Sequence, residues 1–289
     1  MHESPRATAA HGRSLRVLLC LSLSLLIVTA ASAAGYRVEV EQGGVARWDG
    51  EGITRCGMDG RAFAPVDDSC WYPIDFRRDP GRIEIARWTS GGIETGWLDI
   101  VEREFEKQDI EFPDDTYVHL SQENLDRHYR EQSVIRPLLR KDWKKPAQFS
   151  IPLGKPAETL PGGGGFAAHR TFNGEPRARH RGTDYAIALG TPVLAVADGD
   201  VVLAEEHFFA GLGVYINHGN GLFSLSFHMQ NAMDAGSAVE KGAKIGEVGS
   251  TGRSTGPHLH LGIHWRGAWI DPEWLYLKAE QIPRVQAAE

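Results

Sequence analysis

Short segments in which apolar and polar residues alternate, separated by turn residues, run through the C-terminal half of the chain. A period of two is typical of strands with one buried face, and the Asn220-Gly221 pair between two such segments is a strong hairpin signal. No long helical period interrupts the series, so we expect this half to be an antiparallel, all-β domain. The expected strands lie at residues 191–197, 201–204, 213–217, 222–227, 244–248 and 258–265.

The N-terminal half shows the same kind of pattern. Turns are marked by Asp49-Gly50, Asp59-Gly60 and Asp79-Pro80-Gly81. No cluster of titratable side chains in this half suggests catalysis, so we expect a β-sandwich-like domain with a packing or docking role. The expected strands lie at residues 36–40, 82–88 and 97–101.

One helix and one linker are expected between the two β regions. Ser121 is a suitable N-cap for a helix that runs to about Arg136 and is ended by Pro137. Residues 155–165 contain two prolines and four successive glycines, which is typical of a linker. The predicted organisation is a signal peptide at 1–33, a β-rich accessory domain at 34–120, the helix and linker at 121–165, the second β domain at 166–278 and a tail at 279–289.

The N-terminus resembles a secretory signal. Three arginines precede an apolar run from Val17 to Ala30, and Ala31-Ser32-Ala33 resembles a cleavage site. An uncleaved signal anchor is the alternative. No second apolar run follows, so no stable membrane span is expected after cleavage.

Charge and cysteine usage fit an exported globular protein. The formal net charge is -7, and no basic cluster suggests a nucleic-acid partner. Removal of the apolar run leaves two cysteines, Cys56 and Cys70, an even number that favours a disulfide in an exported chain. Two free buried thiols are the alternative.

Two stretches carry residues suited to a metal site. Gly256-Pro257-His258-Leu259-His260-Leu261 places two histidines on one face of an extended segment, and His180-Arg181-Gly182-Thr183-Asp184 lies upstream. A hydrolytic zinc site needs three protein ligands and one open position. His180, Asp184 and His260 would supply two imidazoles and one carboxylate, with Gly182 allowing a tight backbone between the first two.

Six further histidines fall into three groups. His228 follows a hairpin strand and His258 shares the segment of His260, so both are candidates for proton transfer near neutral pH. His264 is a candidate partner for a metal ligand. We expect ordinary surface or half-buried positions for the others, which lie outside every motif: His119, His128 and His207.

The ordered set of motifs from about Phe166 to Leu275 resembles the lysostaphin-type (LytM-type) zinc metallopeptidases. The resemblance implies that His180, Asp184 and His260 bind one Zn²⁺ per chain, and that His228 and His258 assist the attacking water and the transition state. It also implies a compact antiparallel β-domain with an open groove. The matching stretches are residues 170–174, 180–185, 190–193, 218–221 and 249–260.

The resemblance implies an exported zinc metalloendopeptidase that hydrolyses peptide bonds in peptidoglycan stem peptides or cross-links, with a zinc-bound water as nucleophile. The alternative is a catalytically silent, peptidoglycan-binding or hydrolase-activating module. An intramolecular cover of the groove by the N-terminal region or the linker is a further expectation. The periplasm is favoured over release from the cell. The sequence leaves open which bond is cut, the choice between endopeptidase and carboxypeptidase, and the oligomeric state.

Overall fold

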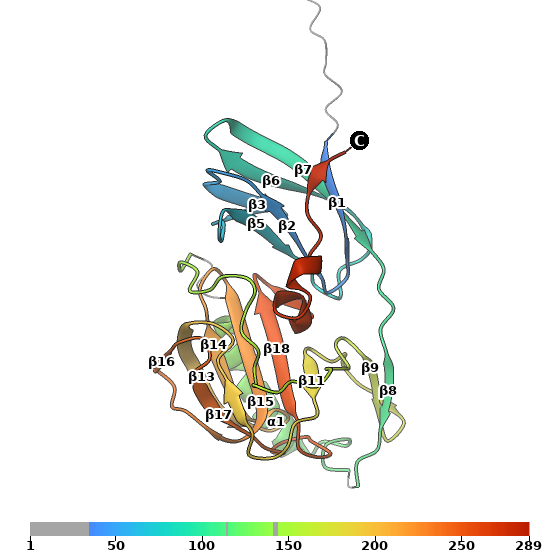
Figure 1. Cartoon of the computed structure of the whole chain (residues 1–289). Coiled ribbons are helices and arrows are strands. Elements are labelled where there is room, and N and C mark those ends of the chain that lie inside the picture. Colours follow the sequence, from blue (N-terminus) through green and yellow to red (C-terminus); the bar gives the residue numbers. More distant parts are fainter. Residues whose placement is uncertain (1–34, 114, 141–143, 289) are drawn as a thin grey trace, which may run out of the picture. The chain divides into compact units, whose positions relative to one another are not determined.

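The structure, a computed structural model, describes residues 35–113, 115–140 and 144–288 (Figure 1). This part of the chain is mainly β, with one α-helix, α1 (Gln122–Leu138), which confirms the predicted fold class. The predicted signal peptide lies outside the described residues. Among the described helices, none has the length and apolar character that a membrane span requires. The predicted domain boundaries stay predictions.

The N-terminal strands form a six-stranded sheet and a two-stranded sheet that share one apolar cluster. This cluster includes the side chains of Trp48, Tyr72 and Leu98, all fully buried. Strand β1 (Tyr36–Glu41) pairs in parallel with β7 (Gly92–Val101) and antiparallel with β20 (Gln286–Ala287), so the predicted tail contributes to this sheet. The larger sheet has the order β20 (Gln286–Ala287), β1 (Tyr36–Glu41), β7 (Gly92–Val101), β6 (Gly81–Thr89), β3 (Arg55–Met58) and β4 (Arg61–Phe63), and the smaller one pairs β2 (Val45–Asp49) with β5 (Ser69–Pro73).

A disulfide joins this cluster across the two sheets. Cys56 on β3 and Cys70 on β5 are bonded, with their Cα atoms 5.5 Å apart. The predicted bridge is therefore confirmed, and the alternative of two free thiols is wrong.

Removing the bridge is expected to destabilise the N-terminal sheets. The Cys56→Ala/Cys70→Ala pair opens a loop with a sequence separation of 14 residues. Loss of a bridge that closes a loop of this length lowers the free energy of unfolding by about 3 kcal/mol in the chain-entropy model. Thermal unfolding of the double variant, compared with the reduced and oxidised native chain, measures the effect. An unchanged midpoint in all three would show that the bridge is dispensable.

The C-terminal strands form one nine-stranded, antiparallel sheet. Its central strands, β18, β15 and β14, lie side by side (Figure 1). The main path is β11 (Thr183–Tyr185), β18 (Leu259–Trp265), β15 (Leu222–Ala232), β14 (Gly211–Asn217), β13 (Gly199–His207) and β16 (Ala238–Val239), and the remaining strands are β12 (Pro192–Leu194), β17 (Lys244–Val248) and β19 (Ala268–Ile270). Two short 3-10 helices follow, η1 (Pro272–Leu275) and η2 (Ala279–Gln281).

Strand β18 separates two environments because its side chains alternate between the faces of the sheet. Leu259, Leu261 and Ile263 are fully buried in the main apolar cluster on one face. His260 and His264 alternate with them and therefore lie on the other face, which also carries Phe223 and Phe227 of β15 opposite them in register. The candidate site residue His260 therefore lies on the second face, opposite the main apolar cluster.

Helix α1 packs on that second face. Ile135 of α1 and Leu139, which caps its C-terminal end, share an apolar cluster with Tyr215, Phe223 and Leu225 of the sheet. The side chain of Ser121 accepts a hydrogen bond from the Asn124 amide, which confirms the predicted N-cap. The predicted end at Arg136 is wrong by two residues, because Pro137 is accommodated in the last turn.

A small three-stranded sheet connects the two halves. Strand β8 (Lys107–Ile110) pairs in parallel with β9 (His169–Phe172), which pairs antiparallel with β10 (Glu175–Pro176). After β10, residues 177–182 lead into β11 (Thr183–Tyr185). Residues from before and after the helix therefore border the same edge of the large sheet.

Candidate metal centre

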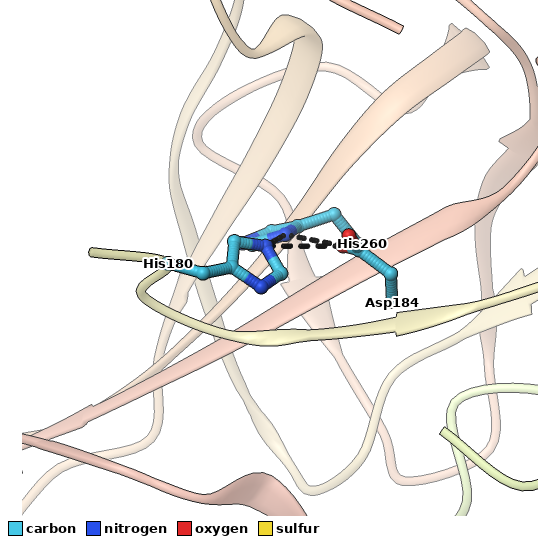
Figure 2. A group of neighbouring side chains, drawn as sticks. All are labelled: His180, Asp184 and His260. Carbon is cyan, nitrogen blue, oxygen red and sulfur yellow. Dashed lines mark hydrogen bonds and ion pairs between the residues drawn. The ribbon is translucent and has the colours of Figure 1, made fainter. Parts of the chain in front are cut away.

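Three side chains from the two neighbouring strands β11 and β18 and the preceding loop meet at one point. Asp184 lies directly opposite His260 in the antiparallel pairing of β11 with β18, and His180 lies in the loop before β11. Figure 2 shows the three side chains pointing toward one another. The Nε2 atom of His180 is 2.8 Å from Nδ1 of His260 and 3.2 Å from Oδ1 of Asp184, and the last two atoms are 2.9 Å apart.

This arrangement fits a zinc ion. Zinc–nitrogen and zinc–oxygen bonds of about 2.0–2.1 Å in a tetrahedron place neighbouring ligand atoms about 3.3 Å apart. The three observed separations are slightly shorter, so a small outward movement of the side chains would accommodate the ion. Two imidazoles and one carboxylate are also a donor set that zinc prefers. No other group of three such side chains occurs in the part of the chain that the structure describes.

The protonation states of His180 and Asp184 suit a metal site. The Gly165 carbonyl oxygen lies 2.7 Å from His180 Nδ1. A carbonyl only accepts, so Nδ1 carries the proton and Nε2 keeps its lone pair for the centre. Burial lowers the pKa of His180 to about 4. Burial raises the pKa of Asp184, but the neighbouring His180 and His260 outweigh it and hold that pKa well below its usual range.

Arg170 supports the carboxylate from the side away from the centre. Its Nη2 donates to Oδ2 of Asp184 at 2.7 Å, and its Nε donates to Oε1 of Gln108 at 2.8 Å. Oδ1 of Asp184 is thereby left for the histidines. Because Gln108 lies on β8 and Arg170 on β9, the small three-stranded sheet holds this contact in place.

The ring of His260 is fixed by its two neighbours. It stacks on Phe227 with ring centroids 5.1 Å apart. A Cβ atom added at Gly182 would lie 2.6 Å from Nε2 of His260. Gly182 is therefore required to leave room for the ring, rather than to permit a tight turn as the sequence suggested.

Replacing Gly182 with alanine is expected to weaken metal binding without unfolding the domain. The added methyl group must displace the His260 ring or the Leu261 carbonyl, which would lie 2.5 Å away. We expect zinc affinity to fall by about 10–100-fold, the range seen when the support of a metal ligand is lost. Competition with a fluorescent zinc chelator measures the affinity, and circular dichroism checks the fold. Unchanged affinity would contradict the packing argument.

His228 and His258 lie beside this centre, and their Nδ1 atoms contact backbone carbonyls. His228 Nδ1 is 2.8 Å from the Thr251 oxygen, and His258 Nδ1 is 2.9 Å from the Gly256 oxygen. Both Nε2 atoms are therefore unprotonated in the neutral rings. The two ring centroids are 4.6 Å apart, and His258 Nε2 is 3.9 Å from Oδ1 of Asp184.

Backbone geometry directs these two side chains. His228 has a φ of 64° at an irregularity in β15, where the pairing with β14 shifts register between Ser226 and Met229. Bulges commonly redirect a side chain toward a site. His258 precedes β18, which begins at Leu259, so the expectation that it shares the strand with His260 is wrong. Burial, followed by the neighbouring charges of His260 and His258, lowers the pKa of His228 to about 3.

A cavity of about 630 Å³ is lined by Asp184 and by the four histidines around the centre, His180, His228, His258 and His260. Residues of α1, including Glu131 and Ile135, line it as well, and Oε1 of Glu131 accepts the Phe208 amide at 2.9 Å. His207 also lines the cavity and is 5% exposed, so its expected surface or half-buried position is wrong. His264 packs on Trp269 and contacts none of the metal-site side chains.

Sequence reasoning brought together the five residues that the structure places around the centre, but it missed their supports. The carbonyls of Gly165, Thr251 and Gly256 carry no side-chain signal, and only the fold reveals them. Arg170 lies within a matched motif, and the arginine itself was the available signal. The glycine-rich segment 162–165 is also more than a linker, because Gly164 forms two backbone hydrogen bonds with Asp184.

Comparison with known proteins gives matches over the same region. The sequence profile of peptidase family M23 matches residues 178–272. Peptidoglycan DD-endopeptidase ShyA of Vibrio cholerae is 44% identical over 114 residues, which are 39% of this chain and 26% of that protein. DD-carboxypeptidase/endopeptidase Mpg of Neisseria meningitidis is 39% identical over 109 residues, which are 38% of this chain and 25% of that protein.

A solved structure extends the comparison to both halves. A crystal structure from Pseudomonas aeruginosa, provisionally designated peptidase M23, aligns with a TM-score of 0.62 at 26% identity and covers 80% of this chain and 92% of its own. The chain spans about a quarter of the length of the curated relatives it matches. The matched residues include all three side chains of the centre as well as His228 and His258. Over residues 178–272, the chain is therefore similar to peptidase family M23.

Proposed function

We propose that this chain is an exported zinc metalloendopeptidase that hydrolyses peptide bonds in peptidoglycan stem peptides or cross-links. The observation that carries the proposal is the meeting of His180 Nε2, Asp184 Oδ1 and His260 Nδ1 within 3.2 Å of one another. The family and the names of the relatives supply the reaction class and the kind of substrate. We propose one zinc ion per chain.

When bound, zinc would polarise the scissile carbonyl and lower the pKa of a water molecule. His180, Asp184 and His260 would hold the ion, with Arg170 donating a hydrogen bond to Oδ2 of Asp184. The Nε2 atoms of His228 and His258 would exchange protons with the attacking water and the departing amine. Their Nδ1 contacts with backbone carbonyls would keep both rings oriented during these transfers.

Digestion of purified sacculi tests the proposal. The full chain is incubated with sacculi in the presence of zinc or with a chelator, and the soluble products are identified by mass spectrometry. We expect zinc-dependent release of fragments with new amino and carboxyl ends at one peptide bond. Binding to sacculi without any new end would favour the alternative, a silent binding or hydrolase-activating module.

We propose that α1 covers the catalytic face in the form described here. The helix packs through Ile135 and Leu139 on the sheet face that carries His260, and it lines the cavity. Such a cover would restrict access of a large cell-wall polymer. The same packing of α1 supports a second proposal, in which the chain is inactive until a partner or substrate displaces the helix.

Weakening the helix contact is expected to increase cleavage. Ile135 is 8% exposed, and truncating a buried isoleucine to alanine typically costs about 2–5 kcal/mol of packing energy. Ile135→Ala should therefore open the cavity more often and raise the initial rate on sacculi. Val134→Ala is the matched control, because Val134 lies on the same helix and is 52% exposed. A lower rate for Ile135→Ala, with the control unchanged, would make α1 a wall of the site rather than a cover.

Export to the periplasm is also proposed. It is supported by the resemblance of residues 1–33 to a signal peptide and by relatives named for action on peptidoglycan. The disulfide between Cys56 and Cys70 fits an oxidising compartment.

A further inference from the structure

The cavity that contains the candidate metal centre has a strongly cationic wall. Seven of its lining residues are arginines, whereas Glu131 and Asp184 are its two acidic residues. Arg77 pairs with Asp75 and Arg170 with Asp184. The other five arginines have no carboxylate partner among the residues that the structure describes. A wall of this charge attracts anionic ligands and raises their local concentration.

Arg253 stands out among these five by its environment. Its guanidinium lies between two aromatic rings, 4.5 Å from the centroid of Phe172 and 4.2 Å from that of Phe209. Its side chain makes no hydrogen bond or ion pair with any residue in the described part of the chain. Two aromatic faces hold a guanidinium in a fixed plane and leave its five N–H donors available to a ligand. Burial, reinforced by Arg170 and Arg177, lowers the pKa of Arg253 to about 10, which still leaves it charged.

The position of Arg253 connects it to the reacting centre. It lies in the loop before β18, and its neighbour Ser254 has Oγ 3.3 Å from Nδ1 of His258. The backbone N–H of Arg253 donates to the Phe209 carbonyl at 2.9 Å, which fixes the base of the side chain. Phe172, on its other side, lies two residues after Arg170 on β9. The guanidinium is therefore a rigid, charged fork on the same cavity wall as His258.

A D,D-amide presents a matching anion. In such an amide, the scissile nitrogen is the α-amino nitrogen of a D-centre. If the carboxyl group on that same centre is free, its carboxylate carbon lies two bonds from the scissile nitrogen. Both a terminal D-amino acid and a direct cross-link between stem peptides meet this description. A glycine bridge does not, because the carboxyl group of each bridging glycine is itself bound in an amide. Only a carboxylate so close to the scissile bond keeps a constant distance from the centre, as a rigid guanidinium requires.

We propose that Arg253 binds the free carboxylate on the amine side of the scissile bond and thereby selects D,D-amides over glycine bridges. This inference rests on the proposed peptidase function and narrows its substrate class. The same carboxylate would be recognised in both substrates, the direct cross-link and the terminal D-amino acid. Arg253 would act as a substrate-binding residue, with Phe172 and Phe209 positioning it.

The experiment compares two synthetic substrates. One is a directly cross-linked stem-peptide dimer with a free carboxylate beside the scissile amide, and the other carries a primary amide at that carboxyl group. We expect the native chain to cleave the acid with a kcat/KM at least about 10–100-fold higher than the amide, the range of a charge-assisted hydrogen bond. In Arg253→Gln this preference should fall to near one, chiefly by loss of rate on the acid. Arg253→Lys should retain part of the preference.

Arg136→Gln is the matched control, because Arg136 lines the same cavity and also lacks a carboxylate partner in the described chain. It removes the same charge and should leave the preference for the acid intact. Equal cleavage of both substrates by the native chain would overturn the proposal. An equal loss on both substrates in Arg253→Gln would assign the residue a structural role and overturn it as well.

A binding measurement separates this proposal from the proposed function. Isothermal titration of the zinc-free chain with each dimer needs no turnover. Acid-selective binding that is lost in Arg253→Gln would support the carboxylate site even if the native chain cleaves neither dimer, in which case the peptidase proposal alone fails. Equal affinity for the two dimers in a chain that cleaves neither would overturn both.

Discussion

Replacement of His260 with alanine is expected to abolish zinc binding and hydrolysis together. The variant loses the Nδ1 atom that lies 2.8 Å from His180 Nε2 and 2.9 Å from Asp184 Oδ1. Loss of the metal removes several kcal/mol of transition-state stabilisation, so the rate should fall on the order of 10³-fold or more. Zinc content by atomic absorption and cleavage of sacculi measure the two effects. Full activity in a zinc-free variant would end the proposed function.

The fold is expected to survive, since the main apolar cluster lies on the opposite face of β18. His260→Gln keeps more of the volume between Phe227 and Gly182 and provides a second test if alanine disturbs the packing. His264→Gln is the matched control, because His264 lies on the same strand and face without contacting the centre. The control should bind zinc like the native chain. Circular dichroism and thermal unfolding check the fold of each variant.

Replacement of His228 with asparagine is expected to reduce turnover but leave zinc in place. No atom of His228 belongs to the cluster of three ligand atoms, so the metal should remain. General acid–base groups contribute about 10²–10⁴-fold, and the expected loss in kcat lies in that range. Asparagine is chosen because it tolerates the left-handed φ of 64° better than most residues. Steady-state kinetics and zinc content provide the measurements.

A change in KM alone would place His228 in substrate binding, contrary to a role in proton transfer. Loss of zinc together with activity would instead make it a metal ligand. His258→Asn offers a parallel test, since the Nε2 atom of His258 faces the same Asp184 oxygen at 3.9 Å. If both residues handle protons, the double variant should lose less than the product of the two single losses, because groups acting as a unit are non-additive.

The strands and the cluster of His180, Asp184 and His260 could be predicted because both leave local signals. Alternation of apolar residues identified β14, β15, β17 and β18, and Asn220-Gly221 identified the turn between β14 and β15. Two separate histidine-containing stretches indicated the metal site. The pairing of Asp184 with His260, which brings these stretches together, depends on strand register.

Long-range contacts could not be predicted, because they depend on which surfaces meet. The position of α1 on the sheet face that carries His260 depends on Ile135 joining the apolar cluster that includes Tyr215, which alternation alone does not specify. The same limit applies to the pairing of β20 with β1, in which residues 286–287 complete the first sheet of the chain. His207 is buried because it ends β13 and lines the same cavity as residues of α1, which the sequence pattern does not reveal.

The glycine-rich segment contacts the candidate metal ligands, so metal binding there would be coupled to the order of this segment. Gly165 holds His180 through its carbonyl, and Gly164 is bonded to the backbone of Asp184. By thermodynamic linkage, any event that shifts this segment must change zinc affinity by the same factor by which zinc stabilises the segment. Slower hydrogen exchange of the Gly164 amide in the presence of zinc would therefore report occupancy of the centre formed by His180, Asp184 and His260.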